Sequence, residues 1–409
     1  MRLKNYALVT AGYWAYTITD GALRMLVLLY FHDLGYSPVS IAFLFLAYEF
    51  MGIVTNLIGG WVGARTGLNR TLIAGLGLQI VALVALTLQQ VDWREWVTVV
   101  YVMAAQALSG VAKDLTKMSS KSAVKFVAGD QEGALFRMVA ILTGSKNALK
   151  GVGFFIGAAL LAWLGYDAAL WTLAALIAVT LGVVAVMLDE DIGKSKKKPP
   201  LRSILSKSDA INRLSFARFF LFSSRDIWFV VALPIFLDER FGWSFYGIGG
   251  FLAAWIVGYG IVQSAAPKWL HRGQARGRPR ADEIKAARTW ALALGIISAA
   301  IATAVGLDIA ITFAVVGGLI VFGVAFALNS SLHSYLILAY ADDDDVSLDV
   351  GFYYSANAAG RLVGTMLSGV LYLWGGLELA LWGSTAFLAI TWLLTLRLPA
   401  IEVRRPALV

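Results

Sequence analysis

The residues of this sequence with the clearest chemical potential are charged side chains inside long apolar stretches. Six bases occupy such positions: Arg24, Lys146, Lys150, Arg218, Arg225 and Arg361. Three acids do the same: Asp20, Glu49 and Asp226. A charge at the centre of a membrane costs about 3 kcal/mol and is tolerated where it faces water, a ligand or an opposite charge. Because three acids cannot neutralise six bases, we expect an anionic substrate to supply the missing negative charge.

Helical spacing places several of these residues on shared faces. Lys146 and Lys150 are four residues apart, and Tyr354, Asn357 and Arg361 follow one another at spacings of three and four. Arginine presents a rigid fork of donors that suits phosphate or carboxylate, whereas lysine is a mobile point charge. This combination favours a polyanionic substrate that contains phosphate.

We predict that nine residues bind this substrate: Arg24, Lys113, Lys146, Asn147, Lys150, Arg225, Tyr354, Asn357 and Arg361. Lys113 begins a series with Lys117, Lys121 and Lys125 at intervals of four, which is either an electrostatic ramp toward the cavity or an ordinary basic helix end. Arg218 is left out of the predicted set, because it lies nearer the helix entrance.

The three buried acids are candidates for proton coupling: Asp20, Glu49 and Asp226. The alternative is that they form structural ion pairs. Asp20 and Arg24 are four residues apart and suit such a pair, and Lys146 and Lys150 could pair with Glu49 or Asp226. Arg225 and Asp226 are adjacent and point in different directions, so we expect no pair between them.

The composition is that of a polytopic membrane protein. Of 409 residues, 59% are hydrophobic and 15% charged, against about 25% charged in soluble domains. With about 20 apolar residues per span, we predict an all-α membrane protein with twelve transmembrane helices. The predicted spans are 6–31, 39–63, 71–89, 95–115, 134–164, 168–188, 210–237, 245–267, 289–306, 308–338, 349–374 and 377–397.

The loops alternate in charge, which predicts the orientation. Lysine and arginine gather in connections such as 113–137, 194–213 and 268–288, and such loops face the cytoplasm. Both termini are therefore expected in the cytoplasm, although the acidic connection 341–345 runs against the pattern. The net charge of +8 has the same cause, so we expect no nucleic-acid partner.

The two halves of the sequence resemble each other. Tyr13, Asp20 and Gly35-Tyr-Ser correspond to Phe219, Asp226 and Gly242-Trp-Ser, and Ser145-Lys-Asn-Ala corresponds to Ser355-Ala-Asn-Ala. We therefore predict an N-terminal six-helix bundle at 1–190, a cytoplasmic linker at 191–209 and a C-terminal six-helix bundle at 210–409. In transporters with such repeats the substrate binds near the midplane, between the halves.

The loop after the second predicted span resembles that of the major facilitator superfamily. Its residues are Gly60-Trp-Val-Gly-Ala-Arg65-Thr-Gly67-Leu-Asn-Arg70, where the family usually has an aspartate at the position of Ala64. The departure puts the family's gating salt bridge at this aspartate in doubt. The resemblance implies the major facilitator architecture of two pseudo-symmetric six-helix bundles.

Several longer stretches are similar to the organoarsenical efflux permeases of bacterial arsenic-resistance operons. They are Tyr16–Leu26, Ala104–Ser119, Leu142–Phe155 and Arg225–Pro234. This resemblance implies export of 1-arseno-3-phosphoglycerate, a functional link to glyceraldehyde-3-phosphate dehydrogenase, arsenate resistance and a place in the bacterial inner membrane.

Two other functions stay open from the sequence. One is a sugar-phosphate or inorganic phosphate antiporter, and the other is a transporter that binds anionic lipid headgroups. No phosphate-binding loop, metal-ligand cluster or nucleophile constellation is evident in the sequence, so we expect neither a cofactor nor enzymatic activity. We expect a monomer whose partners are membrane lipids and a small anionic substrate.

Overall fold

The computed structural model describes residues 2–66, 68–128, 134–188, 208–270, 281–340 and 346–399. These residues form helices joined by short turns, and the predicted all-α fold is confirmed. The helices are α1 (Arg2–Asp33), α2 (Pro38–Thr66), α3 (Leu68–Thr87), α4 (Glu95–Ala128), α5 (Ala134–Leu164), α6 (Tyr166–Met187), α7 (Asp209–Phe229), α8 (Ala232–Phe241), α9 (Phe245–Leu270), α10 (Ala281–Gly306), α11 (Ile311–Tyr340) and α12 (Val346–Leu396).

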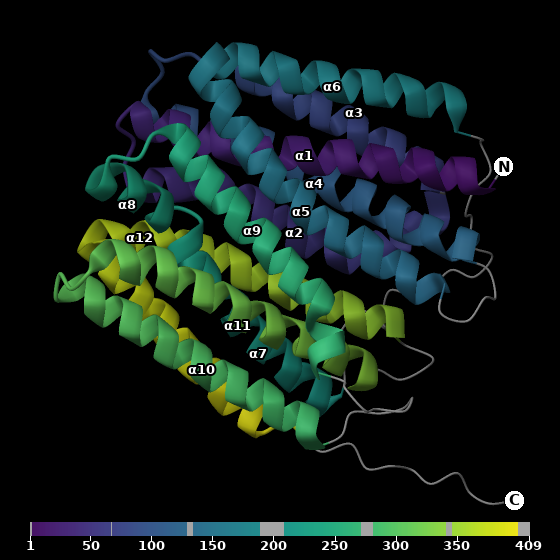
Figure 1. Ribbon diagram of the computed structural model, residues 1–409. Coiled ribbons are helices and arrows are strands. Elements are labelled where there is room, and N and C mark those ends of the chain that lie inside the picture. The colour runs from purple at the N-terminus through teal and green to yellow at the C-terminus, as the bar shows by residue number, and fades with distance from the viewer. Residues whose placement is uncertain are drawn as a thin grey trace, which may run out of the picture.

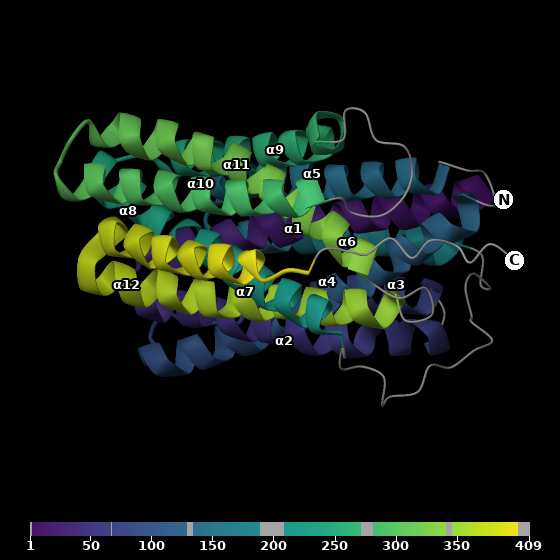
Figure 2. The ribbon, with the colours of Figure 1, turned by 90° about the horizontal axis from the view of Figure 1, so that it is seen from below.

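Ten segments of the described chain are long and apolar enough to cross a membrane. One of them lies in α12, whose backbone is non-helical at Gly375 and Gly376. Its two arms correspond to the last two predicted spans and lie antiparallel in Figure 2, with their turn at the end opposite the termini. When the two arms of α12 are counted separately, the ten segments become eleven. The helix α1, which is not among the ten, brings the number to twelve, so the helices are consistent with twelve spans.

The seventh predicted span is interrupted between α7 and α8. Pro234 lacks a backbone N–H, and its ring crowds the carbonyl of Val230 in a continuous helix. The backbone N–H groups of Val231 and Ala232 instead donate to Ser368 Oγ at 3.2 and 3.0 Å. The hydroxyl from α12 thus satisfies the donors that the break exposes, as an apolar environment requires.

The helices form two groups that lie side by side (Figure 1). Within the first group α1 packs on α5, and α4 packs on α2 and α3; within the second, α12 packs on α7 and α10. Contacts of α5 with α9 and of α2 with α12 join the groups. The predicted domain limits stay predictions, since most of the linker 191–209 lies outside the described residues.

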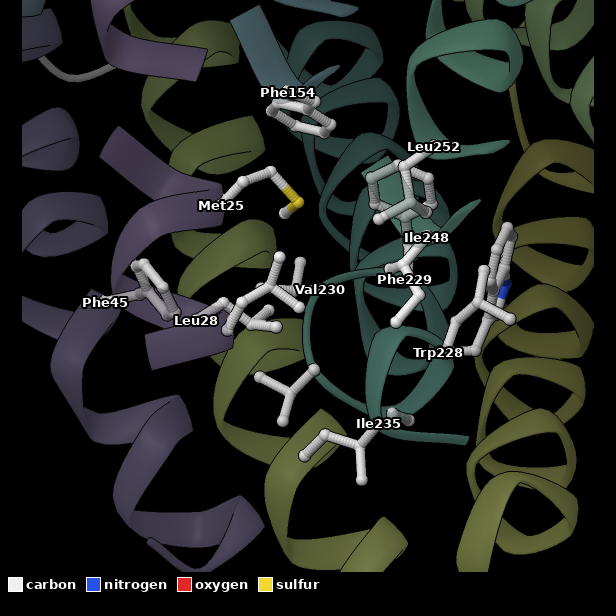
Figure 3. Packing of buried hydrophobic residues seen from close by; sticks show 14 of the residues in the cluster. Met25, Leu28, Phe45, Phe154, Trp228, Phe229, Val230, Ile235, Ile248 and Leu252 are labelled. Atoms are coloured by element: carbon white, nitrogen blue, oxygen red, sulfur yellow. The ribbon is translucent and has the colours of Figure 1, made fainter. Parts of the chain in front are cut away.

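The start of α1 and the last described residues after α12 lie toward the same side of the molecule, which we call the terminal side, and the opposite side is the far side (Figure 1). On the far side an apolar cluster closes the space between the groups. Figure 3 shows Met25, Leu28 and Phe154 facing Phe229 and Val230, all buried in one cluster. We call these five residues the far-side plug.

A contact between a histidine and an aspartate also joins the groups on the far side. His32 Nε2, at the end of α1, lies 3.0 Å from Asp238 Oδ2 on α8. The pair therefore joins the two groups of helices at the level where α1 ends, beyond the plug.

Two pairs of glycines, Gly153/Gly157 on α5 and Gly360/Gly364 on α12, allow close contacts between helices. A Cβ at Gly157 would overlap the backbone of Ala22, and one at Gly364 would lie 2.7 Å from the carbonyl oxygen of Ser223.

Gly157→Ala is expected to lower the free energy of unfolding by about 1–3 kcal/mol, since the added methyl group must displace the backbone of α1. Gly77→Ala on α3 is the matched control, because nothing lies within 4 Å of its Cβ position. Thermal unfolding of the detergent-solubilised protein measures both. Equal unfolding temperatures for the two variants would contradict the close packing of α5 on α1.

Candidate substrate-binding site

A cavity of about 240 Å³ lies between the two groups of helices, on the terminal side of the plug. Every residue of the predicted binding set lines it: Arg24, Lys113, Lys146, Asn147, Lys150, Arg225, Tyr354, Asn357 and Arg361. The three predicted acids line it as well: Asp20, Glu49 and Asp226. The structure thus brings together residues from six helices that are distant in the sequence.

The lining carries a surplus of positive charge. It includes eight basic and four acidic side chains. The sequence prediction missed three of these charges: Asp114, Lys117 and Arg218. Asp114 and Lys117 lie on α4, just beyond Lys113, where the basic series made the segment look like a solvated helix end.

One ion-pair network crosses between the groups of helices. Glu49 Oε1 accepts hydrogen bonds from Arg24 Nη2 on α1 and from Arg361 Nη2 on α12, each at 2.6 Å. Arg361 Nε also donates to Asp226 Oδ2 at 3.2 Å, and Arg225 Nη2 lies 2.5 Å from Asp226 Oδ1. Two buried acids therefore neutralise part of the charge of three arginines, with Glu49 bound to both groups.

A second network lies within the first group of helices. Lys150 Nζ on α5 donates to Asp20 Oδ2 at 3.0 Å, and Tyr48 Oη donates to Asp20 Oδ1 at 2.5 Å. The neighbouring Asn147 donates to Gln263 Oε1 on α9 at 2.9 Å. Asp20 thus neutralises Lys150, and an amide pair joins α5 to α9 at the cavity wall.

The structure decides two questions of pairing that the sequence raised. The alternative pair of Asp20 with Arg24 does not form, because Lys150 and Glu49 reach these residues from other helices. Arg225 does pair with Asp226, so the expectation of no pair between them was wrong. Sequence adjacency sets the directions of the two Cβ atoms, but the long arginine side chain curls back to the neighbouring carboxylate.

Asp114 forms a third, smaller cluster toward the terminal side. Its carboxylate lies 3.2 Å from Lys117 Nζ and accepts a hydrogen bond from Thr55. Lys117 Nζ also donates to Asn56 Oδ1 at 2.8 Å. The side chains of Lys121 and Lys125, and those of the loop 60–68, lie outside the described residues.

Lys113 and Arg218 form no ion pair with an acid in the described part of the chain. Lys113 Nζ lies 4.0 Å from the centre of the Tyr48 ring. Arg218 Nε donates to Asn357 Oδ1 at 3.0 Å, Nη1 donates to Ser330 O and Oγ at 3.1 Å, and the guanidinium stacks 4.0 Å over Phe222. These contacts hold both cations in place without a direct ion pair to a described carboxylate.

Comparison with known proteins identifies the family. The profile of the Major Facilitator Superfamily matches residues 9–282. The chain belongs to the major facilitator superfamily. As a member it is a multi-pass membrane protein of a transporter family, and the predicted architecture of two six-helix bundles is that of the superfamily.

Solved structures of several transporters share this fold. The human organic anion transporter MFSD10 (TETRAN) is 14% identical, with 96% of this chain and 99% of that chain covered and a TM-score of 0.67. A POT family transporter in complex with a thioalcohol-conjugated peptide is 13% identical, with 94% of both chains covered and a TM-score of 0.77. A bacterial homologue of the iron transporter ferroportin, in an inward-facing state, is 17% identical, with 97% and 98% covered and a TM-score of 0.70. No curated protein matches the sequence.

Proposed function

We propose that this protein is a secondary transporter that exports a phosphorylated organic anion by alternating access. The observation that carries the proposal is the cavity between the bundles, lined by eight bases and four acids. Such a surplus attracts an anion electrostatically and repels cations. The nine predicted binding residues are proposed to contact the substrate from both bundles.

The orientation follows from the loop charges. Because the described helix ends that flank the basic connections lie on the terminal side (Figure 1), that side and both termini are proposed to face the cytoplasm. The plug and the His32–Asp238 pair close the far side, so the cavity is proposed to receive its substrate from the cytoplasm. Export then requires the far-side contacts to open.

The substrate we propose is 1-arseno-3-phosphoglycerate, exported across the bacterial inner membrane so that arsenate resistance results. The resemblance to organoarsenical efflux permeases supports it, together with cationic residues contributed by both bundles. The fold is also that of a human organic anion transporter. The protein would act downstream of glyceraldehyde-3-phosphate dehydrogenase, as a monomer among membrane lipids.

Asp20, Glu49 and Asp226 remain the proposed proton-coupling residues. Each accepts hydrogen bonds from one or more bases. Protonation of such an acid releases its base, which then becomes available to an anion. Exchange of protons for substrate follows from this competition.

Uptake of labelled substrate into everted membrane vesicles tests the proposed site. Lys150→Ala and Arg361→Ala are each expected to lower the uptake rate at least tenfold, since each breaks one of the two networks that shape the cavity. Lys285→Ala is the control, because this lysine is exposed on α10. Unchanged uptake by both cavity variants would overturn the site assignment.

The alternative of a sugar-phosphate or phosphate antiporter uses the same cavity, and the same vesicles distinguish it. Glycerol 3-phosphate or inorganic phosphate would then compete with the labelled substrate at equal concentration. A transporter of anionic lipids needs a lateral opening between the bundles. The packing of α5 on α9 and of α2 on α12 argues against such an opening.

A further inference from the structure

Seven of the eight basic residues of the cavity fall into two classes that the sequence does not distinguish. Five of them lie within 3.2 Å of a carboxylate oxygen: Arg24, Lys117, Lys150, Arg225 and Arg361. Lys113 and Arg218 have no such partner among the described residues. The first class shapes the cavity, while the second leaves positive charge at its surface.

Aromatic rings and neutral hydrogen-bond acceptors hold the second class. Arg218 is buried, its guanidinium stacks on Phe222, and the neutral oxygens of Asn357 and Ser330 accept its hydrogen bonds. Lys113 stacks on Tyr48. Rings and amides stabilise a cation and fix its position without cancelling its charge, so both groups are preorganised for an anion.

Both cations lie close to the same stretch of α12, although they come from different bundles. Asn357 binds Arg218 directly. A Cβ built on Gly52 would lie 3.2 Å from Lys113 Nζ and 3.7 Å from Ala358 Cβ. The end of the Lys113 side chain therefore lies near the contact between α2 and α12. The α12 residue at this contact, Ala358, directly follows Asn357 in the sequence.

We propose that Lys113 and Arg218, one from each bundle, are the principal contacts for the anionic groups of the substrate. Arg218 supplies a directional fork suited to phosphate, and Lys113 supplies a mobile charge for a second anionic group. The inference rests on the proposed function, and it adds Arg218 to the predicted binding set. Lys150, Arg225 and Arg361, which are paired with acids in this structure, are then secondary contacts.

The test is binding of radiolabelled 3-phosphoglycerate to the purified full-length protein in detergent. Lys113→Gln and Arg218→Gln are each expected to raise the Kd at least tenfold and to leave the unfolding temperature close to that of the wild type. Neither change strands a buried acid. By contrast, Lys150→Gln strands Asp20, so it is expected to lower the unfolding temperature, and the added change Asp20→Asn is expected to restore it.

Two controls remove the same charges outside the cavity. One control is Arg213→Gln, because Arg213 lies on α7 like Arg218 but pairs with the exposed Asp209. The other is Lys285→Gln, because Lys285 is exposed on α10. Both are expected to bind like the wild type.

If Arg218→Gln does not fold, Asn357→Asp neutralises Arg218 in place, since the new carboxylate occupies the position that accepts the hydrogen bond from Arg218 Nε. It is expected to weaken binding to the same extent.

The outcomes separate the two proposals. This inference is overturned if the wild type binds 3-phosphoglycerate and the Kd stays the same in Lys113→Gln and in either Arg218→Gln or Asn357→Asp. The proposed function still stands in that case. A wild-type protein that binds neither 3-phosphoglycerate nor inorganic phosphate overturns both. Loss of binding in these variants with retained unfolding temperatures supports the assignment.

Discussion

Glu49→Gln is expected to lower the free energy of unfolding by about 3–5 kcal/mol and to abolish most transport. Glu49 is fully buried and accepts hydrogen bonds from Arg24 of one bundle and Arg361 of the other, both at 2.6 Å. Glutamine has nearly the same size but no charge, so two guanidinium groups remain close together without their shared anion. Removing one partner of a buried ion pair has an effect of this size. Thermal unfolding and vesicle uptake measure the two effects.

Glu95→Gln is the matched control for this substitution. Glu95 begins α4 on the surface and accepts a hydrogen bond from Ser40. Its loss is expected to change neither the unfolding temperature nor uptake. A Glu49→Gln protein with wild-type stability would show that the carboxylate does not hold the bundles together, and full uptake would rule out Glu49 as a coupling residue.

Cross-linking the far side is expected to stop transport completely. The chain contains no cysteine, so a pair introduced by His32→Cys and Asp238→Cys reacts without a background. The two side chains meet at 3.0 Å across the bundles, and a short, reducible thiol cross-linker spans them. Alternating access requires this contact to open, so uptake is expected to disappear on cross-linking and to return on reduction.

A pair inside one helix controls for the reagent. Asp209→Cys and Arg213→Cys replace an ion pair on α7, and their cross-link constrains no movement between bundles. The cross-linked control is therefore expected to transport normally. Transport that persists in a fully cross-linked His32→Cys, Asp238→Cys protein would mean that the far side is not the moving gate.

The two predictions concern different parts of one cycle. Glu49 joins the bundles beside the cavity, where a substrate anion competes for Arg361. The His32–Asp238 pair joins them beyond the plug, where the substrate must leave. An anion that weakens the first contact can therefore promote rearrangement of the second, because both hold the same two bundles in the same arrangement.

Local properties of the sequence were sufficient to predict the helices and the cavity residues. A run of apolar residues long enough to span a bilayer, and a spacing of three or four along a helix, are both visible without a partner. For this reason each predicted span overlaps a helix of the described chain. Lys146, Lys150, Asn357 and Arg361 were likewise expected on shared faces, and the structure brings them to one cavity. The break at Pro234 was not predicted, because both sides of it continue the same apolar span.

Only the tertiary structure decided which charges cancel. Glu49 and Arg361 are 312 residues apart, and Asp20 and Lys150 are 130 apart, so no local spacing connects them. An ion pair depends on distances of a few ångströms between side-chain ends, and those distances arise when separate helices pack. The excess of buried positive charge was therefore readable from the sequence. The sequence did not show that this excess charge lies at Lys113 and Arg218, and Arg218 was left out of the predicted site. That result depended on where the four acids of the cavity lie in the folded protein.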